Sequence, residues 1–385
     1  MIAFALSLQA QDSHDARGLN HFYNLEYDEA LTEFEAAEGQ DSQAIGPHNH
    51  VAETLLYREM YRNGALDTEL VSGNNPFLRR DKLNPSPATE KRFDDEIQRA
   101  MDLSNARLTR NPNDTGALYG RGAAYGLRAN YEFLVRKAWH DALRDATAAR
   151  KDHNRITELE PSNYDARLVQ GLHDYVVGSL PWTWRMLGFL IGFHGDKDRG
   201  IHTVEEVSHK GTYNRTDAEM LLCALYRREN EPRKALPLLE DLLRRFPRNN
   251  LLLFEQAQMY SSVGDGTKAV AAIERIAAMK KSGLSGYANV PWEKIYFQLG
   301  NIQFWYNDLD HALENLRKVT ASGNEVDLNT GVLAWMRVGQ IYDMTNRRPE
   351  AVEAYRRAIA FAPQADAAKE SRGYMSSPYR RENKS

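Results

Sequence analysis

The histidine pair His48 and His50 is the first place in this sequence where residue types and spacing suggest chemistry. An H-x-H pair, here in GPHNHVAETLLYREM, could offer two imidazoles to a metal ion. Residues two apart on a helix point to different sides, however, and no cysteine or further histidine stands close by to complete a site. The pair therefore favours capping and core packing, and we expect no metal and no cofactor.

Catalytic motifs are absent from the rest of the sequence. There is no G-x-S-x-G elbow, no G-x4-G-K-[ST] phosphate loop, no H-E-x2-H zinc motif and no dinucleotide fingerprint. The single cysteine, Cys223, can form neither an internal disulfide nor a zinc site made of thiolates. We therefore expect a protein that is not an enzyme, with an unrecognised site around His48 as the alternative.

Composition narrows the class of partner. Of the 385 residues, 42% are hydrophobic and 26% are charged, which is ordinary for a helical globular protein and too apolar for general disorder. The formal net charge is only −4, so the chain has no basic field suited to nucleic acid. The expected partner is a protein or a peptide, and the sequence leaves the oligomeric state open.

The best-marked structural element is a helical hairpin over residues 332–363, VLAWMRVGQIYDMTNRRPEAVEAYRRAIAFAP. Large residues on its first helix meet small ones where two backbones approach closely, and the final proline ends the second helix because it has no N–H. The positions that carry this pattern are Trp335, Val338, Gly339, Tyr342, Ala351, Tyr355, Ala358 and Pro363. Their spacing resembles the tetratricopeptide repeat, a helix-turn-helix unit of about 34 residues.

The same pattern recurs through the chain. Hairpins in this register begin near Thr216, Asn250 and Glu293, and the first two starts are 34 residues apart. Looser copies begin near Gln11 and Thr115. The resemblance implies an all-α fold, a superhelical solenoid of antiparallel helical hairpins in the manner of tetratricopeptide repeats.

Changes in composition and the residues that end or cap helices predict the organisation of the chain. Proline ends several second helices, and Asn, Ser or Asp follows to cap the next helix. A loop rich in Gly, Asn and Pro interrupts the N-terminal half. The predicted parts are a possible truncated signal peptide at 1–10, divergent repeat-like hairpins at 11–179 with a loop insert at 57–91, an apolar helix and connecting hairpin at 180–215, tetratricopeptide repeats at 216–367 and a disordered tail at 368–385.

The first residues leave the location of the protein open. Ile2 to Leu8 is a short apolar run followed by Gln9-Ala10-Gln11, which resembles the end of a secretory signal without its basic region. If residues 1–10 are a leader, the protein is periplasmic or secreted; otherwise it is cytoplasmic.

A second apolar run, LPWTWRMLGFLIGF at residues 180–193, is too short to cross a bilayer as a helix. Its length favours a buried helix. The alternative is an envelope- or membrane-associated protein in which this segment contacts lipid or another subunit without spanning the membrane.

The middle of the chain carries a more particular resemblance. Residues 180–260 contain an apolar helix, a GF-x-GD turn, and a helix ended by proline before an LLLF run. The turn consists of Gly192, Phe193, Gly195 and Asp196. This succession is similar to the eukaryotic inclusion-body-clearance and tetratricopeptide thirty-nine proteins. The resemblance concerns packing elements and implies architecture only.

The first helices of the C-terminal hairpins offer the best candidate binding residues, because stacked first helices line the concave face of such a solenoid. In register, their fifth and ninth positions form one apolar and one amide column, four residues apart on one face. Amides can pair with a peptide backbone while aromatic residues receive its side chains. The predicted partner-binding residues are Phe254, Phe297 and Met336, then Gln258, Asn301 and Gln340, with Trp305 extending the apolar part.

Two other interpretations of these helices stay open. Lys294, Asn301 and Arg337 supply the residue types of a clamp for a C-terminal carboxylate, although other clamp positions do not match. The aromatic residues could also be buried by the superhelix or by a second copy. The sequence thus predicts a non-enzymatic scaffold that binds a peptide or protein in the groove of its repeats.

Overall fold

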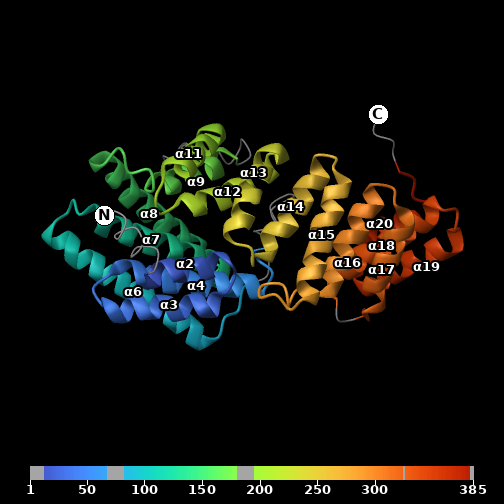
Figure 1. Cartoon of the computed structure of the whole chain (residues 1–385), viewed down its shortest axis with the longest axis horizontal. Coiled ribbons are helices and arrows are strands. Elements are labelled where there is room, and N and C mark those ends of the chain that lie inside the picture. The colour runs from blue at the N-terminus through green and yellow to red at the C-terminus, as the bar shows by residue number, and fades with distance from the viewer. Residues whose placement is uncertain (1–12, 67–81, 180–194, 324–325, 382–385) are drawn as a thin grey trace. The chain divides into compact units, whose positions relative to one another are not determined.

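The computed structural model describes residues 13–66, 82–179, 195–323 and 326–381, and over these ranges the chain is built from α-helices with no β-strand. The predicted all-α fold of stacked helical hairpins is confirmed. The chain divides into two compact units, Met1–Asn249 and Asn250–Ser385. Each unit is a series of antiparallel hairpins in which every helix packs against the next one in the chain (Figure 1).

The described residues of the first unit form five hairpins, made by α2 with α3, α4 with α6, α7 with α8, α9 with α11, and α12 with α13. A single turn of π-helix follows α7 at Glu132–Arg136. The helices are α2 His14–Tyr23, α3 Tyr27–Gln40, α4 Ile45–Arg62, α6 Pro87–Arg110, α7 Thr115–Tyr131, α8 Trp139–Leu159, α9 Arg167–Gly178, α11 Lys197–Lys210, α12 Arg215–Arg228 and α13 Pro232–Arg245.

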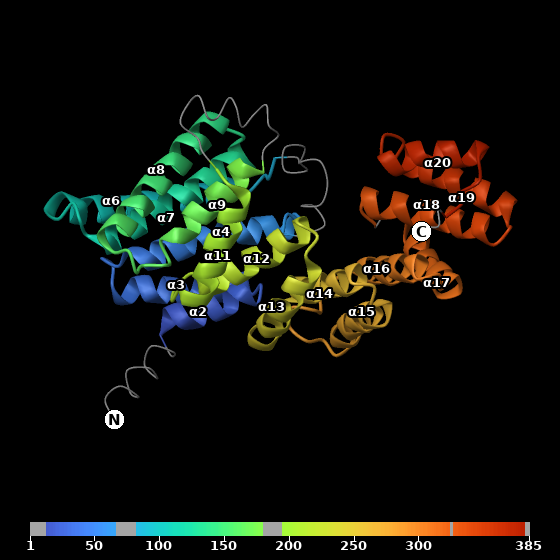
Figure 2. The same ribbon diagram turned by 90° about the horizontal axis from the view of Figure 1, so that it is seen from above.

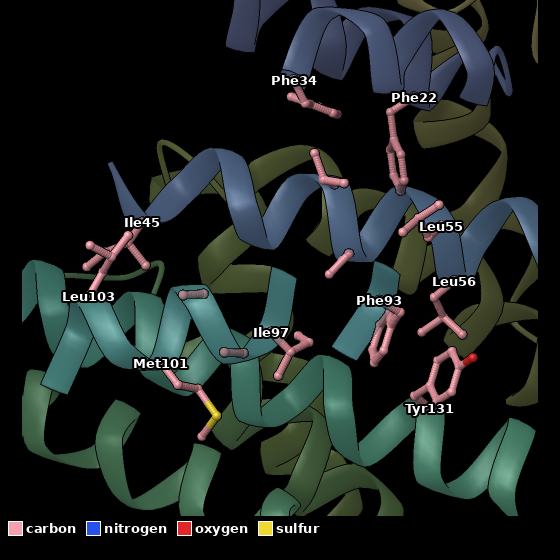
Figure 3. Close-up of a cluster of buried hydrophobic side chains, with 14 of the residues drawn as sticks. Phe22, Phe34, Ile45, Leu55, Leu56, Phe93, Ile97, Met101, Leu103 and Tyr131 are labelled. Atoms are coloured by element: carbon pink, nitrogen blue, oxygen red, sulfur yellow. The ribbon is translucent and has the colours of Figure 1, made fainter. Parts of the chain in front are cut away.

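Aromatic and aliphatic side chains fill the interior between these hairpins (Figure 3). The rings of Phe93 and Tyr131 stack with their centroids 4.0 Å apart. Phe34 packs directly on Gly18, where any Cβ would overlap its ring. The small residue in α2 therefore sets how closely α3 can approach it.

The first unit closes on itself, because its last hairpin packs against its first. The guanidinium of Arg248 donates to both carboxylate oxygens of Glu26, at 2.6 and 2.9 Å. Asn249 donates to the carbonyl of Tyr23, and the Tyr23 ring lies 5.0 Å from that of Phe246. The hairpin α12–α13, which the sequence groups with the C-terminal repeats at 216–367, thus packs within the first unit.

Within residues 250–323 and 326–381, the second unit forms three further hairpins followed by the helix α20, which packs against α18 and α19 (Figure 2). Its core includes Phe304, Leu316, Val338 and Tyr355. The helices are α14 Asn250–Ser262, α15 Gly266–Lys281, α16 Trp292–Trp305, α17 Leu309–Ala321, α18 Leu328–Met344, α19 Arg348–Phe361 and α20 Asp366–Ser376.

Five hairpin turns share one backbone geometry. In each of the five, the first helix is followed by a residue with φ between 57° and 87°, and the N–H of the next residue bonds to the carbonyl five positions back, as in the 2.7 Å bond from Arg347 to Tyr342. This is the Schellman arrangement, which ends a helix and reverses the chain. The left-handed positions are Leu25, Asn230, Gly264, Asn307 and Asn346.

Several predicted segments differ from the structure. Residues 368–376 are helical in α20 and the chain is described to Arg381, so the prediction of disorder from residue 368 is wrong there. The insert expected at 57–91 is shorter, because α4 continues to Arg62 and α6 begins at Pro87. The proposed leader at 1–10 and the apolar run at 180–193 lie outside the described residues.

Candidate peptide-binding surface

Small residues hold the first helices of the second unit against their partners. An added Cβ on Gly300 would overlap Leu316, and one on Gly339 would overlap the ring of Tyr355. These contacts commit one side of α16 and α18 to the hairpin interface. The fifth positions of α16 and α18, Phe297 and Met336, precede these glycines by three residues, on the same side of each helix, and both are buried.

The seven predicted binding residues divide into two groups by exposure. Phe254, Gln258 and Asn301 are partly exposed, and Trp305 is 51% exposed. The buried group consists of Phe297, Met336 and Gln340, which are 9%, 3% and 1% exposed.

The expectation that Met336 and Gln340 are free to contact a partner is wrong for the chain in this conformation. Tyr374, Met375 and Tyr379 pack against the buried cluster that contains Met336. The segment that covers α18 is thus α20 with the residues after it, a region for which the sequence predicts disorder. The accessible part of the surface lies over α14 and α16.

Arg337 is the centre of this surface. Its Nε donates to Oδ1 of Asn301 at 3.2 Å and its Nη1 to Oε1 of Gln340 at 2.7 Å. Its guanidinium carbon also lies 4.7 Å from the ring centroids of both Phe304 and Trp305. Burial lowers the pKa of Arg337, but an arginine starts so high that it stays charged at neutral pH.

The two amides are therefore oriented by the protein itself. With their oxygens accepting from Arg337, Asn301 and Gln340 keep only their N–H groups for other partners. Of the two, Asn301 is the partly exposed one. Beside it, Trp305 offers a large apolar face.

The α14 side of the surface is tied to α16 by two contacts. Lys294 Nζ lies 4.7 Å from the centroid of the Phe254 ring, and the Tyr306 hydroxyl donates to the carbonyl of Ser261 at 2.8 Å. The residue types of a carboxylate clamp are thus used in other ways, since Lys294 contacts an aromatic face and Arg337 holds Asn301. The surface combines aromatic faces, amide N–H groups and cations.

Sequence reasoning missed Asp343, Tyr379 and Arg381. The Asp343 carboxylate is buried and accepts from Arg348, from the Tyr355 hydroxyl at 2.9 Å and from the backbone N–H of Tyr379 at 2.8 Å. A signal existed in the sequence SSPYRR, where a proline, a tyrosine and two arginines follow a short helix. Its low apolar content led to the prediction of disorder instead.

The histidine pair is separated, as predicted for residues two apart on a helix. The ring of His50 lies 4.8 Å from that of Phe34. Nδ1 of His48 instead lies 2.7 Å from a carboxylate oxygen of Glu96 and 3.1 Å from one of Glu38.

The three possible ligand atoms of Glu38, His48 and Glu96 lie within 4.8 Å of one another. Hydrogen bonds to the two carboxylates raise the pKa of His48 to about 9. At neutral pH the protonated imidazole is thus the cation between them, and an ion pair accounts for this geometry.

The stacked hairpins and the glycine and aromatic register define a fold of the tetratricopeptide-repeat class. Sequence comparison gives the more particular result. Residues 307–366 match the family described as tetratricopeptide repeat, and residues 179–283 match the family described as Iml2/Tetratricopeptide repeat protein 39. The chain therefore carries tetratricopeptide repeats, and its middle region is similar to the Iml2 and tetratricopeptide repeat protein 39 family.

Similar solved structures include several tetratricopeptide-repeat proteins. The C-terminal part of such a protein from Cytophaga hutchinsonii is 14% identical, with a TM-score of 0.47, over 72% of this chain and 95% of that one. Yeast Tom70 is 13% identical, with a TM-score of 0.39, over 94% of both chains. A human IFIT1 dimer with m7Gppp-AAAA is 13% identical, with a TM-score of 0.43, over 93% of this chain and 83% of that one.

These likenesses do not indicate a partner for this chain. No curated protein matches the sequence. In the part of the chain that the structure describes, no helix has the length and apolar character needed to cross a membrane. Arrays of tetratricopeptide repeats serve as scaffolds for protein–protein interaction, and this coarse function follows from the fold.

Proposed function

We propose that the second unit is a non-enzymatic scaffold that binds a peptide segment of a partner protein along the first helices α14 and α16. The observation that carries the proposal is Trp305, a tryptophan that keeps 51% of its surface exposed beside Asn301. Exposed tryptophans are costly to solvate and are enriched where partners contribute most binding energy.

The chemistry around Trp305 suits an extended or helical peptide. The side-chain N–H group of Asn301 can donate to a peptide carbonyl, because Oδ1 of Asn301 already accepts from Arg337 and fixes the orientation of the amide. Phe254 and Trp305 offer apolar faces for side chains of the ligand. Gln258, partly exposed on α14, extends the row of amides.

Site-specific photo-cross-linking tests this proposal. Benzoylphenylalanine placed at Trp305 in the full chain, expressed in its native cell, should cross-link to one or a few defined proteins. Tyr213, which is 80% exposed in the first unit, is the matched control position. Asn301→Ala combined with the label at 305 should weaken the cross-link severalfold and leave the helical content unchanged.

Two results would refute the proposal. One is the same set of weak cross-links from positions 305 and 213, which would mean that Trp305 meets only random neighbours. The other is an undiminished cross-link in both Asn301→Ala and Phe254→Ala chains, because a groove that binds peptide must use at least one of these side chains.

A further inference from the structure

The residues after α20 lie on the surface of the second unit as a peptide ligand would. The backbone N–H of Tyr379 donates to Oδ2 of Asp343, near the end of α18. Two residues on, Arg381 reaches the end of α16. The chain therefore crosses from one first helix to the next, over the face that the register assigns to binding.

Arg381 makes polar and aromatic contacts at once. Its guanidinium donates to the carbonyl of Phe304 and to Oδ1 of Asn307, and it lies 4.7 Å from the centroid of the Phe304 ring. The carbonyls at the end of a helix carry partial negative charge, and an aromatic face attracts a cation. The end of α16 thus forms a receptor for a guanidinium.

Tyr379 fills the space between α16 and α20. Its ring stands edge-on to that of Tyr374, at 5.3 Å and 85°, and lies 6.2 Å from Phe304. Together with the bond to Asp343, these contacts fix one aromatic side chain and one backbone N–H. The recognised pattern is an aromatic residue followed, two positions later, by arginine.

The fit of this segment is incomplete. Nε of Arg381 is buried and makes no hydrogen bond, so it loses water without gaining a partner. In addition, Arg381 and Arg337 both lie near the rings of Phe304 and Trp305, which brings two positive charges to the same pair of aromatic side chains. Both features weaken the attachment and make the segment replaceable.

We propose that this surface recognises a peptide with an aromatic residue and an arginine two positions after it, and that Tyr379 and Arg381 are the resident occupant that a partner segment displaces. The inference rests on the proposed peptide-binding function, which it deepens by naming the ligand chemistry. In the resident state the segment closes the α18 side of the groove. A partner with the same pattern opens it by competition.

A peptide-binding assay on full-length chains tests the inference. The probe is SSPYRR, residues 376–381, with fluorescein at the N-terminus and an amidated C-terminus. It should bind the Tyr379→Ala, Arg381→Ala double variant at least tenfold more tightly than the wild type, because only the variant has lost its resident occupant. The matched control is Arg380→Ala, which removes the exposed neighbouring arginine and should behave like the wild type.

Peptide specificity provides the second arm. A probe with alanine in place of the tyrosine and of the second arginine should not bind any of the chains. Equal binding of both probes, or equal affinity of SSPYRR for wild type and double variant, would overturn the inference.

Hydrogen exchange checks the resident state directly. The Tyr379 amide should be protected in the wild type and in Arg380→Ala, and should exchange at least tenfold faster in Arg381→Ala. Unchanged exchange of α19 amides would show that the variant is folded. An unprotected Tyr379 amide in the wild type would contradict the proposed occupancy.

A second copy of the chain could supply the segment instead. Light scattering would then give the mass of two chains for the wild type and of one for the double variant, and that result would overturn the intramolecular arrangement.

The failure of this inference can be told apart from that of the proposed function. If SSPYRR does not bind while position 305 still cross-links to a partner, the ligand chemistry is wrong and the scaffold function stands. If cross-linking fails while SSPYRR binds, residues 376–381 only stabilise the fold of this chain, and the proposed partner-binding function is refuted.

Discussion

Arg337 orients the side-chain amides of Asn301 and Gln340 in the second unit. Sequence register places Asn301 and Gln340 one repeat apart, and their oxygens accept from the two ends of one guanidinium. Register could predict that the two amides share a face, because it depends on spacing alone. It could not predict that a cation lies between them, because the bond from Arg337 to Asn301 joins side chains on different helices.

Replacing Arg337 tests this arrangement. Arg337→Ala should lower the free energy of unfolding of the second unit by about 1–3 kcal/mol, because it leaves the buried oxygen of Gln340 without its donor. Arg337→Lys keeps the charge but lacks the planar fork, so it should recover only part of the loss. Urea denaturation of the three chains measures both effects, and equal stability of all three would contradict the role of Arg337.

His48 should make stability depend on pH. Its pKa in the folded chain, about 9, is above the ordinary value of 6.5, so the stabilisation is complete below pH 6.5 and is lost as pH rises to about 9. His48→Gln should therefore destabilise the first unit by on the order of 2 kcal/mol at pH 6, and by much less at pH 10. Hydrogen exchange of α3, α4 and α6 amides measures the difference.

The control for that experiment is His140→Gln, at an exposed position of α8. It should leave the exchange rates of α3, α4 and α6 unchanged at every pH. A destabilisation by His48→Gln that stays constant from pH 6 to pH 10 would mean that the imidazole acts through packing and not through charge.

At the scale of the element, the hairpin turn is as regular as the helices it joins. Asparagine or glycine occupies the left-handed position in four of the five hairpin turns described above, and Leu25 in the fifth. Asparagine and glycine adopt positive φ at little cost, whereas a branched or bulky residue is strained there. The apolar pattern could predict the helices but not these turns, because turn geometry depends on single polar residues between the patterned segments.

Substitution at Asn230 measures this contribution. Asn230→Ala should destabilise the α12–α13 hairpin by about 1 kcal/mol, because alanine adopts the left-handed backbone conformation at this position less readily than asparagine does. Asn230→Gly should be close to neutral. Thermal unfolding followed by circular dichroism would compare the two, and a more stable alanine variant would contradict the turn assignment.

The apolar periodicity of the sequence does not predict the helix α20. Residues 366–376, DAAKESRGYMS, contain few large apolar residues, so their sequence alone predicts no packed helix. In the structure, Ala367, Ala368 and Ser371 are buried because α19 is there to receive them. Tyr374 and Met375 of the same helix pack against the buried cluster that contains Met336, which explains why the predicted surface was wider than the one the chain exposes.

At the scale of the whole molecule, the sequence does not predict the boundary between the two units after Asn249. The repeat register runs through it without a break, since Thr216 and Asn250 are one unit length apart. Besides its packing against α11, α12 is joined to the first hairpin by contacts between residues far apart in the sequence, such as the bond from Tyr23 to Asp217, which spans 194 positions. No local pattern carries that information.

The contact between the first and last hairpins of the first unit brings two partly buried carboxyl groups, those of Glu53 and Asp217, near each other. Burial and the nearby charge of Asp217 raise the pKa of Glu53 from 4.5 to about 7. In the folded chain Glu53 thus keeps a proton that it releases in the unfolded chain, so its contribution to stability is most favourable below pH 4.5 and is lost as pH rises to about 7.

Glu53→Gln should remove this pH dependence. The variant should be more stable than the wild type by on the order of 2 kcal/mol at pH 8, where the wild type must keep a buried charge, and nearly equal at pH 4.5. Hydrogen exchange of α2 and α12 amides across this range is the measurement. A variant that is less stable than the wild type at pH 8 would show that the Glu53 carboxylate has a partner worth more than its burial costs.

The bond from Arg248 to Glu26 can form only late in the synthesis of the chain. A ribosome that adds 5–20 residues per second needs roughly 10–45 s to make the 222 residues that separate these partners. The first hairpin leaves the ribosome early, with Tyr23 still lacking the ring of Phe246 that later packs against it. The nascent chain thus carries an uncovered aromatic edge for most of its synthesis, and we expect chaperones to hold it there until α13 arrives.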